Sequence, residues 1–203
     1  MPHIVDDPVL GHRLSFTEAA DPDGSPVLHV EMWVRPGGGV TAHVHPTLEE
    51  RFTVVSGTPE FLSGRSWWRA GPGRSAVVAP GERHAYRNRG TEVAHVRVEV
   101  RPPSSLQAFL TEVAELARQG AFTRHALPRS PRGLLMAVAV AERHREMTTL
   151  GFPMPPEPIQ RLLFPPLARL AERRGYAASV SSTATSSPAP PTTASAPSSS
   201  SAG

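Results

Sequence analysis

The sequence predicts a mainly β fold, an antiparallel sandwich or barrel, followed by α-helices and a disordered tail. Three observations carry this prediction: a period of two in the first half, helical spacing after Pro102-Pro103, and a final stretch dominated by Ser, Thr, Ala and Pro. A chain of 203 residues is long enough for one domain with additions. We divide it into an N-terminal arm, a β-barrel, a helical extension and a tail, at residues 1–12, 13–101, 102–176 and 177–203.

The predicted strands come from a period of two, in which aliphatic side chains occupy every second position. Residues 28–35 and 95–101 both alternate in this way, which indicates strands with one buried face. Glycine and proline interrupt the region repeatedly, at 36–39, 56–57, 63–64, 71–73 and 80–81. Many short strands at this spacing are typical of a sandwich or barrel.

The first predicted helix follows Pro102-Pro103. Its apolar residues recur every three or four positions, at Leu106, Phe109, Leu110, Val113 and Leu116. Ser104 and Gln107 have the spacing of a capping box, and Gly120 supplies a stop.

Two more helices and a tail complete the predicted organisation. Ser130-Pro131 is a cap followed by proline at the first helical position, so a second helix should run to about Met147. A third should span 158–174 and be broken by Pro165-Pro166. From 177 onward the chain lacks charge and has almost no large apolar residue, which predicts disorder.

Composition excludes several kinds of chemistry. The chain has no cysteine, so disulfides, thiolate ligands and cysteine nucleophiles are absent. All 21 basic residues are arginine, which excludes lysine Schiff bases, pyridoxal-phosphate anchoring and a Walker lysine. The net charge is only +3, and arginines alternate with acids, as in 142–146, so we expect a solvated surface and no nucleic-acid partner.

The sequence also carries features that predict where in the cell the protein is found. The first ten residues contain Asp6 and Asp7 and no apolar core, unlike a secretory signal. The longest apolar run, 134–141, is too short to cross a bilayer, so we expect no membrane association. These observations predict a soluble cytoplasmic protein.

Four residues have the chemistry of a metal site. His43 and His45 lie two apart in a strand-like region, so both imidazoles should project from one face. Glu50 begins the next apolar stretch, and His84 follows a proline-glycine turn. Three imidazoles and a carboxylate suit one divalent transition metal ion (Fe, Mn, Ni, Cu, Co or Zn) and leave positions open, as in catalytic sites. We interpret the isolated histidines as surface or hydrogen-bonded residues, namely His3, His12, His29, His95, His125 and His144.

Two stretches resemble the signature motifs of the cupin superfamily. Residues 37–57 read G-x5-H-x-H-x4-E-x6-G, and residues 73–88 read G-x5-A-P-G-x2-H-x3-N. The resemblance implies a double-stranded β-helix, or jelly-roll barrel, with one metal ion held by His43, His45, Glu50 and His84. One position departs from the usual pattern, because Ala79 stands where the family has proline. Glu49 competes with Glu50, but Glu50 fits the spacing to the glycine that closes the first motif.

The resemblance leaves three functions open. The first is a metalloenzyme of dioxygenase or oxidase type acting on a small oxygenated molecule, with Glu50 as a base and Tyr86 as a hydrogen-bond donor or wall residue. The second is a metal-dependent isomerase or cyclase, although the sequence shows no obvious second acid–base pair. The third is a non-catalytic module that binds a sugar or another metabolite. We expect an apolar cavity with Phe52, Val54 and Tyr86 among its walls.

We also predict a homodimer. Single barrels of this kind expose strand edges and apolar sheet faces, and amphipathic helices add more apolar area that a partner would cover.

Overall fold

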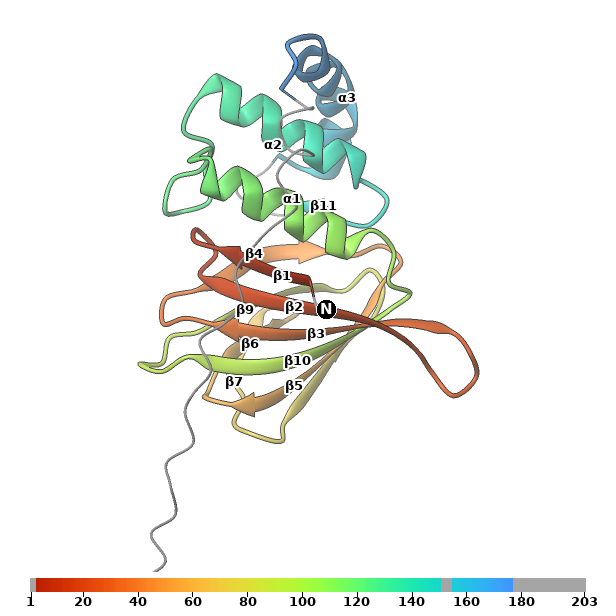
Figure 1. Ribbon diagram of the computed structural model, residues 1–203, viewed down its shortest axis with the longest axis vertical. Coiled ribbons are helices and arrows are strands. Elements are labelled where there is room, and N and C mark those ends of the chain that lie inside the picture. The colour runs from red at the N-terminus through yellow and green to blue at the C-terminus, as the bar shows by residue number, and fades with distance from the viewer. Residues whose placement is uncertain (1–2, 151–154, 177–203) are drawn as a thin grey trace, which may run out of the picture.

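The computed structural model describes residues 3–150 and 155–176, and it is mostly β (Figure 1). The predicted disordered tail, 177–203, lies outside the described residues. The first sheet has the order β1-β2-β3-β10-β5-β8, formed by His3–Asp7, His12–Ala20, Pro26–Val34, Ala94–Arg101, Glu49–Ser56 and Ser75–Val78. The second has the order β11-β4-β9-β6-β7, formed by Thr149–Leu150, Gly39–Val44, Arg83–Arg87, Glu60–Ser63 and Ser66–Arg69. All strand pairs are antiparallel, so the predicted double-sheet fold is confirmed.

The period of two has the predicted consequence for burial. Strand β10 lies between β3 and β5, and its Val96, Val98 and Val100 are buried while the residues between them are not. Val98 is in register with Val30 on one side and Phe52 on the other. These residues belong to one hydrophobic core cluster, to which both sheets contribute side chains. Burial of each such side chain contributes about 1.5–3 kcal/mol, so the alternation fixes which face of the strand points inward.

The first sheet begins earlier than the sequence predicted. Residues 3–7, within the predicted arm, form strand β1, which pairs with β2 from His3–Phe16 to Asp7–His12. Val5 is buried in the barrel core. The pairing of β1 with β2 places Asp7 opposite His12.

Turn glycines hold the strands at fixed lengths. Gly37, Gly57, Gly73 and Gly81 all have φ between +79° and +82°, a region that costs other residues energy. At Gly57 a Cβ atom would also lie 2.8 Å from the Cα of Ala94. These positions agree with the turns predicted from the two motifs.

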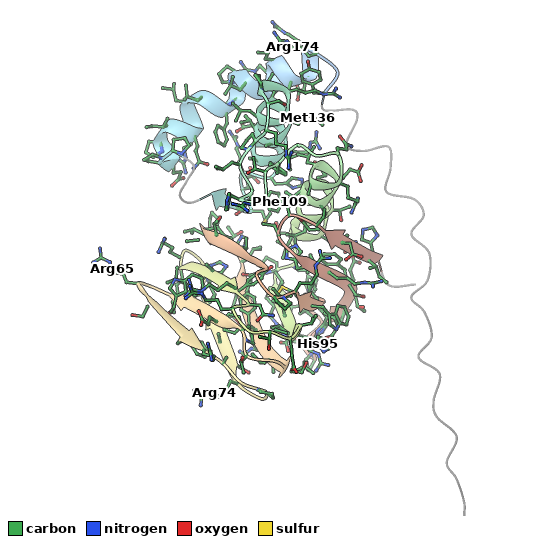
Figure 2. All side chains as sticks on the ribbon, turned by 90° about the vertical axis from the view of Figure 1, so that its left-hand side faces the viewer. Arg65, Arg74, His95, Phe109, Met136 and Arg174 are labelled. Carbon is green, nitrogen blue, oxygen red and sulfur yellow. The ribbon has the colours of Figure 1, made fainter. Side chains whose placement is uncertain are left out.

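Three helices stack on one end of the barrel (Figure 1): α1 (Leu106–Arg118), α2 (Pro131–Arg143) and α3 (Glu157–Arg173). Helix α1 contacts β1, α2 contacts α1, and α3 contacts α2. Phe109 packs against both the barrel core and the core between α1 and α2, and Figure 2 shows it at the boundary between the two parts. Among the described residues, no helix is long and apolar enough to span a bilayer.

The helix ends correct two predictions. Ser130 does cap α2, accepting a hydrogen bond from the Gly133 amide at 3.0 Å, but the capping box at the start of α1 is wrong. The cap residue there is Ser105, with no side-chain cap bond, and Ser104 has φ of +50°. The Ser105 hydroxyl instead lies 2.8 Å from Nδ1 of His144, at the end of α2. Tertiary contact between the helices therefore replaces the local cap.

The third helix is continuous, not broken. Helix α3 passes through Pro165 and Pro166, although each proline removes a backbone donor. Its buried face, which includes Phe164 and Ala168, packs on α2. This packing offsets the cost of the prolines.

Candidate metal centre

The four predicted ligands converge from both sheets. His43 on β4 and His84 on β9 are direct partners in the strand register. Glu50 comes from β5 in the other sheet, and His45 directly follows β4. One potential ligand atom from each residue lies within 4.8 Å of all the others. The fold therefore gathers residues that are up to 41 positions apart (84 − 43) at one point.

A bulge in β4 shapes the site. The β4–β9 register shifts between Val40, which faces Tyr86, and His43, which faces His84. The shift corresponds to one extra residue on β4, and such bulges re-aim side chains beside functional sites. The carbonyl of Thr41, inside the bulge, lies 2.9 Å from Nδ1 of His43. The bulge thus holds this ring in place.

All three histidines use the same nitrogen to contact the backbone. Nδ1 lies 2.9 Å from the Thr41 carbonyl in His43, 2.9 Å from the Met147 carbonyl in His45, and 3.0 Å from the Glu82 carbonyl in His84. A carbonyl only accepts hydrogen bonds, so each Nδ1 must carry a proton. In a neutral ring, Nε2 then presents a lone pair. Fixing the tautomer in this way is what histidine ligands of metals require.

The Nε2 atoms and the Glu50 carboxylate face one another. Nε2 of His43 and Nε2 of His45 are 3.2 Å apart. Nε2 of His84 lies 2.9 Å from Oε2 of Glu50, and neither of these two buried atoms has a hydrogen-bond partner. When all three rings are neutral, these atoms are all acceptors, and a cluster of acceptors without a donor is unfavourable in a buried site. A cation would satisfy all of them, and three nitrogens with one carboxylate oxygen fit a divalent transition ion.

The ionisation of the site is consistent with this interpretation. Burial, followed by the nearby His84 and His45, lowers the pKa of His43 to about 3. Burial also lowers the pKa of His45. For Glu50, burial acts to raise the pKa, but the three histidines outweigh it and the pKa is lowered. Burial acts to lower the pKa of His84, but Glu50 outweighs it and the pKa is raised. The carboxylate and two neutral imidazoles are thus ready to bind a cation at neutral pH.

The four residues line a cavity of about 200 Å³ between the barrel and the helices. Most of its walls are apolar, and they come from both parts of the molecule: Leu14, Val30, Met32, Phe52, Val98 and Val100 from the barrel, and Leu106, Phe109, Leu110, Val113, Leu116 and Val140 from the helices. Two lining residues, Thr41 and His125, are exposed, and they mark where the cavity reaches solvent. Val54, expected as a wall, lies in the barrel core and not among the lining residues.

The helical extension takes part in the site directly. Beyond its apolar lining residues, it supplies the Met147 carbonyl that holds His45. Strand β11, which follows Met147, pairs with β4 at Val44 and His43. The sequence contained no signal for this contact, because a backbone carbonyl leaves no trace in residue identity.

Tyr86 acts as both a wall and a hydrogen-bonding group. It lines the cavity, and its hydroxyl lies 2.7 Å from Nδ1 of His12. Burial, with the charges of Glu50 and Asp7, raises the pKa of Tyr86, so the phenol stays protonated. His12 was expected to be a surface or hydrogen-bonded histidine outside the metal site. It is hydrogen-bonded, but it lies in the wall of the same cavity.

Comparison with known proteins agrees with the motifs. Residues 30–100 match the family model described as a cupin domain. Residues 30–100 are therefore a cupin domain, and the helical part follows it in the chain. No curated protein matches the sequence.

Several solved structures are similar in part. A Klebsiella pneumoniae protein with a double-stranded beta-helix domain is 28% identical over 44% of this chain and 75% of its own, with a TM-score of 0.39. A predicted oxalate decarboxylase from Thermotoga maritima is 17% identical over 49% of this chain and 90% of its own, with a TM-score of 0.41. A cupin sugar phosphate isomerase from Silicibacter pomeroyi is 19% identical over 47% of this chain and 62% of its own, with a TM-score of 0.41.

Proposed function

We propose that the protein is a metal-dependent enzyme of dioxygenase or oxidase type, acting on a small and largely apolar molecule through an oxygen atom. One observation carries the proposal. Three Nε2 atoms, each fixed by a carbonyl behind its ring, and one carboxylate oxygen converge in the wall of an apolar cavity.

The residues have distinct roles in this proposal. His43, His45, Glu50 and His84 would hold a divalent transition ion, which when bound supplies a Lewis acid and a redox centre for dioxygen chemistry. The apolar walls exclude water and orient the body of the substrate. Glu50, whose pKa is lowered by the three histidines around it, would serve as the base. Tyr86 positions His12 and donates or accepts at the edge of the site.

The wall chemistry favours an uncharged, mostly apolar substrate over a sugar. Sugar hydroxyls buried against apolar walls would lose their hydrogen bonds to water without replacement. In the described part of the chain, no arginine lines the cavity. Dianions such as oxalate or a sugar phosphate would therefore find no positively charged side chain there. This weakens the sugar-binding alternative.

A second candidate function is a metal-dependent isomerase or cyclase. Such an enzyme needs a proton donor or acceptor apart from the metal ligands, and the sequence showed none. His12 now provides a buried imidazole in the same cavity. Dioxygen separates the two functions, because an isomerase or cyclase would turn over its substrate under anaerobic conditions.

The test combines metal content with oxygen uptake. We expect about one equivalent of a transition metal by elemental analysis of the purified protein, and oxygen consumption with phenolic or enolic substrates. His84→Ala should fold, lose most of the metal and lose uptake, whereas the matched variant His29→Ala, outside the cavity, should keep both. Full metal content in His84→Ala would contradict the assignment. Metal binding without any turnover would favour a binding module.

The homodimer also stays a proposal. On α3, Ile159, Leu162 and Leu163 are 44%, 73% and 45% exposed, and this apolar surface is of the kind that a partner covers. Light scattering at micromolar concentration should give twice the chain mass, and a monomer would contradict the proposal.

A further inference from the structure

The cavity has a second polar position away from the metal ligands. Asp7 at the end of β1 and His12 at the start of β2 are cross-strand partners. They are 1% and 2% exposed, and both line the cavity. Two buried polar side chains in an otherwise apolar wall need partners.

His12 has only half of its hydrogen-bonding capacity in use. Nδ1 lies 2.7 Å from the Tyr86 hydroxyl. Within residues 3–150 and 155–176, Nε2 has no hydrogen-bond partner. Burial, and to a smaller extent Arg35, lowers the pKa of His12 to about 4, so the ring is neutral at physiological pH. A neutral ring with its Nδ1 occupied offers Nε2 as one donor or one acceptor.

Only one of the two carboxylate oxygens of Asp7 has a hydrogen-bonding role in the fold. Its Oδ1 accepts hydrogen bonds from the amides of Val9 and Leu10, both at 2.8 Å, and so closes the β1–β2 turn. Its Oδ2 is buried and has no hydrogen-bond partner in the described structure. The turn accounts for one oxygen and leaves the other without a partner.

We propose that His12 binds an uncharged hydroxyl group of the substrate, at a position distinct from the metal centre. The inference rests on the proposed function for the existence of a cavity ligand, and it specifies that ligand further. The substrate carries two oxygen functions, one at the metal ligands and one at His12, joined by an apolar body.

Charge and size define the class. The neutral His12 ring offers a carboxylate no positive charge, whereas a hydroxyl both donates and accepts and suits either tautomer of His12. Tyr86 lies two residues after His84 on β9, a step of about 7 Å along the strand, and His12 lies beyond its hydroxyl. The cavity of about 200 Å³ exceeds the roughly 150 Å³ that holds benzene. A single ring with oxygen at both ends fits these limits.

Two matched probes test this inference. The first probe is 4-(2-hydroxyethyl)phenol, whose side chain ends in a hydroxyl. The second is 4-propylphenol, which has a methyl group in place of that hydroxyl. We would measure both dissociation constants by calorimetry, for the wild type and His12→Phe, with zinc bound and without metal. His12→Phe should weaken the hydroxyethyl probe about tenfold, the effect of one lost hydrogen bond. It should change the propyl probe less than about twofold.

Equal weakening of both probes would overturn the inference, and so would no weakening of either. Thermal unfolding of each variant controls for folding. If His12→Phe does not fold, Tyr86→Phe removes only the oxygen that orients His12, and it should weaken the hydroxyethyl probe selectively, by about threefold. The measurements without metal separate the two proposals. If the protein does not bind zinc, the metal centre is refuted. The ratio of the two probes' dissociation constants in the metal-free protein still decides the role of His12.

Discussion

The barrel wall and the helical wall of the cavity contribute different kinds of side chain. The barrel contributes the side chains with ligating or proton-exchanging groups, including His12, Glu50 and Tyr86. The helical extension contributes mostly apolar side chains, with His125 and Thr148 from its connecting segments as exceptions, and one backbone carbonyl, from Met147. The barrel is thus suited to reaction geometry, and the helices to selecting what enters.

The largest effect expected is on the barrel wall. Glu50→Gln keeps the shape of the side chain but removes the only carboxylate of the four-residue group. We expect metal affinity to fall more than about 100-fold, because losing a ligand costs more than losing a residue that supports one. Glu49→Gln is the matched control, next in sequence but outside the group, and should bind metal normally. Competition with a chelator would measure both, and equal loss in the two variants would contradict the assignment of Glu50.

The division between the walls also explains what the sequence could predict. The grouping of the four candidate ligands could be predicted because two motifs with fixed spacing place them on or beside strands, and His43 and His84 do meet in the β4–β9 register. The contact between His12 and Tyr86 spans 74 residues and depends on how two sheets pack, which no local pattern records. The Met147 carbonyl was equally invisible. Local rules also failed at Pro165-Pro166, where packing outweighed a helix-breaking signal.

A pH titration tests the second polar position of the barrel wall. His12 has a pKa of about 4 in the folded protein and about 6.5 when unfolded. Between these values the unfolded chain binds more protons, so the free energy of unfolding should fall as the pH falls from 6.5 to 4. The loss from this residue should be about 3 kcal/mol. Urea unfolding of metal-free wild type and His12→Phe should show a shallower pH dependence in the variant, and identical slopes would contradict the burial of a neutral His12.

Phe109 tests whether the two walls form one unit. Its ring packs against the barrel core and against the α1–α2 core. Because the side chain is half-buried, Phe109→Ala should cost about 2 kcal/mol of unfolding free energy, less than a fully buried phenylalanine. The matched control is Leu162→Ala, an apolar truncation at a residue that is 73% exposed, which should cost about 0.5 kcal/mol or less. Two separate unfolding transitions already in the wild type, or equal costs in the two variants, would show that the helices are not joined to the barrel through this residue.

The smallest effect distinguishes tertiary from local stabilisation at the start of α1. The sequence pattern assigns the cap to Ser104, whereas the structure places the Ser105 hydroxyl against the buried His144 of α2. Ser105→Ala should therefore cost about 1 kcal/mol, the contribution of one hydrogen bond to a buried partner. Ser104→Ala should be nearly neutral, because that residue is exposed and its positive φ affects serine and alanine alike. Urea unfolding of the two variants side by side gives the answer. A larger cost for Ser104→Ala would restore the capping box, and it would mean that the first helix depends on its own sequence more than on the helix stacked above it.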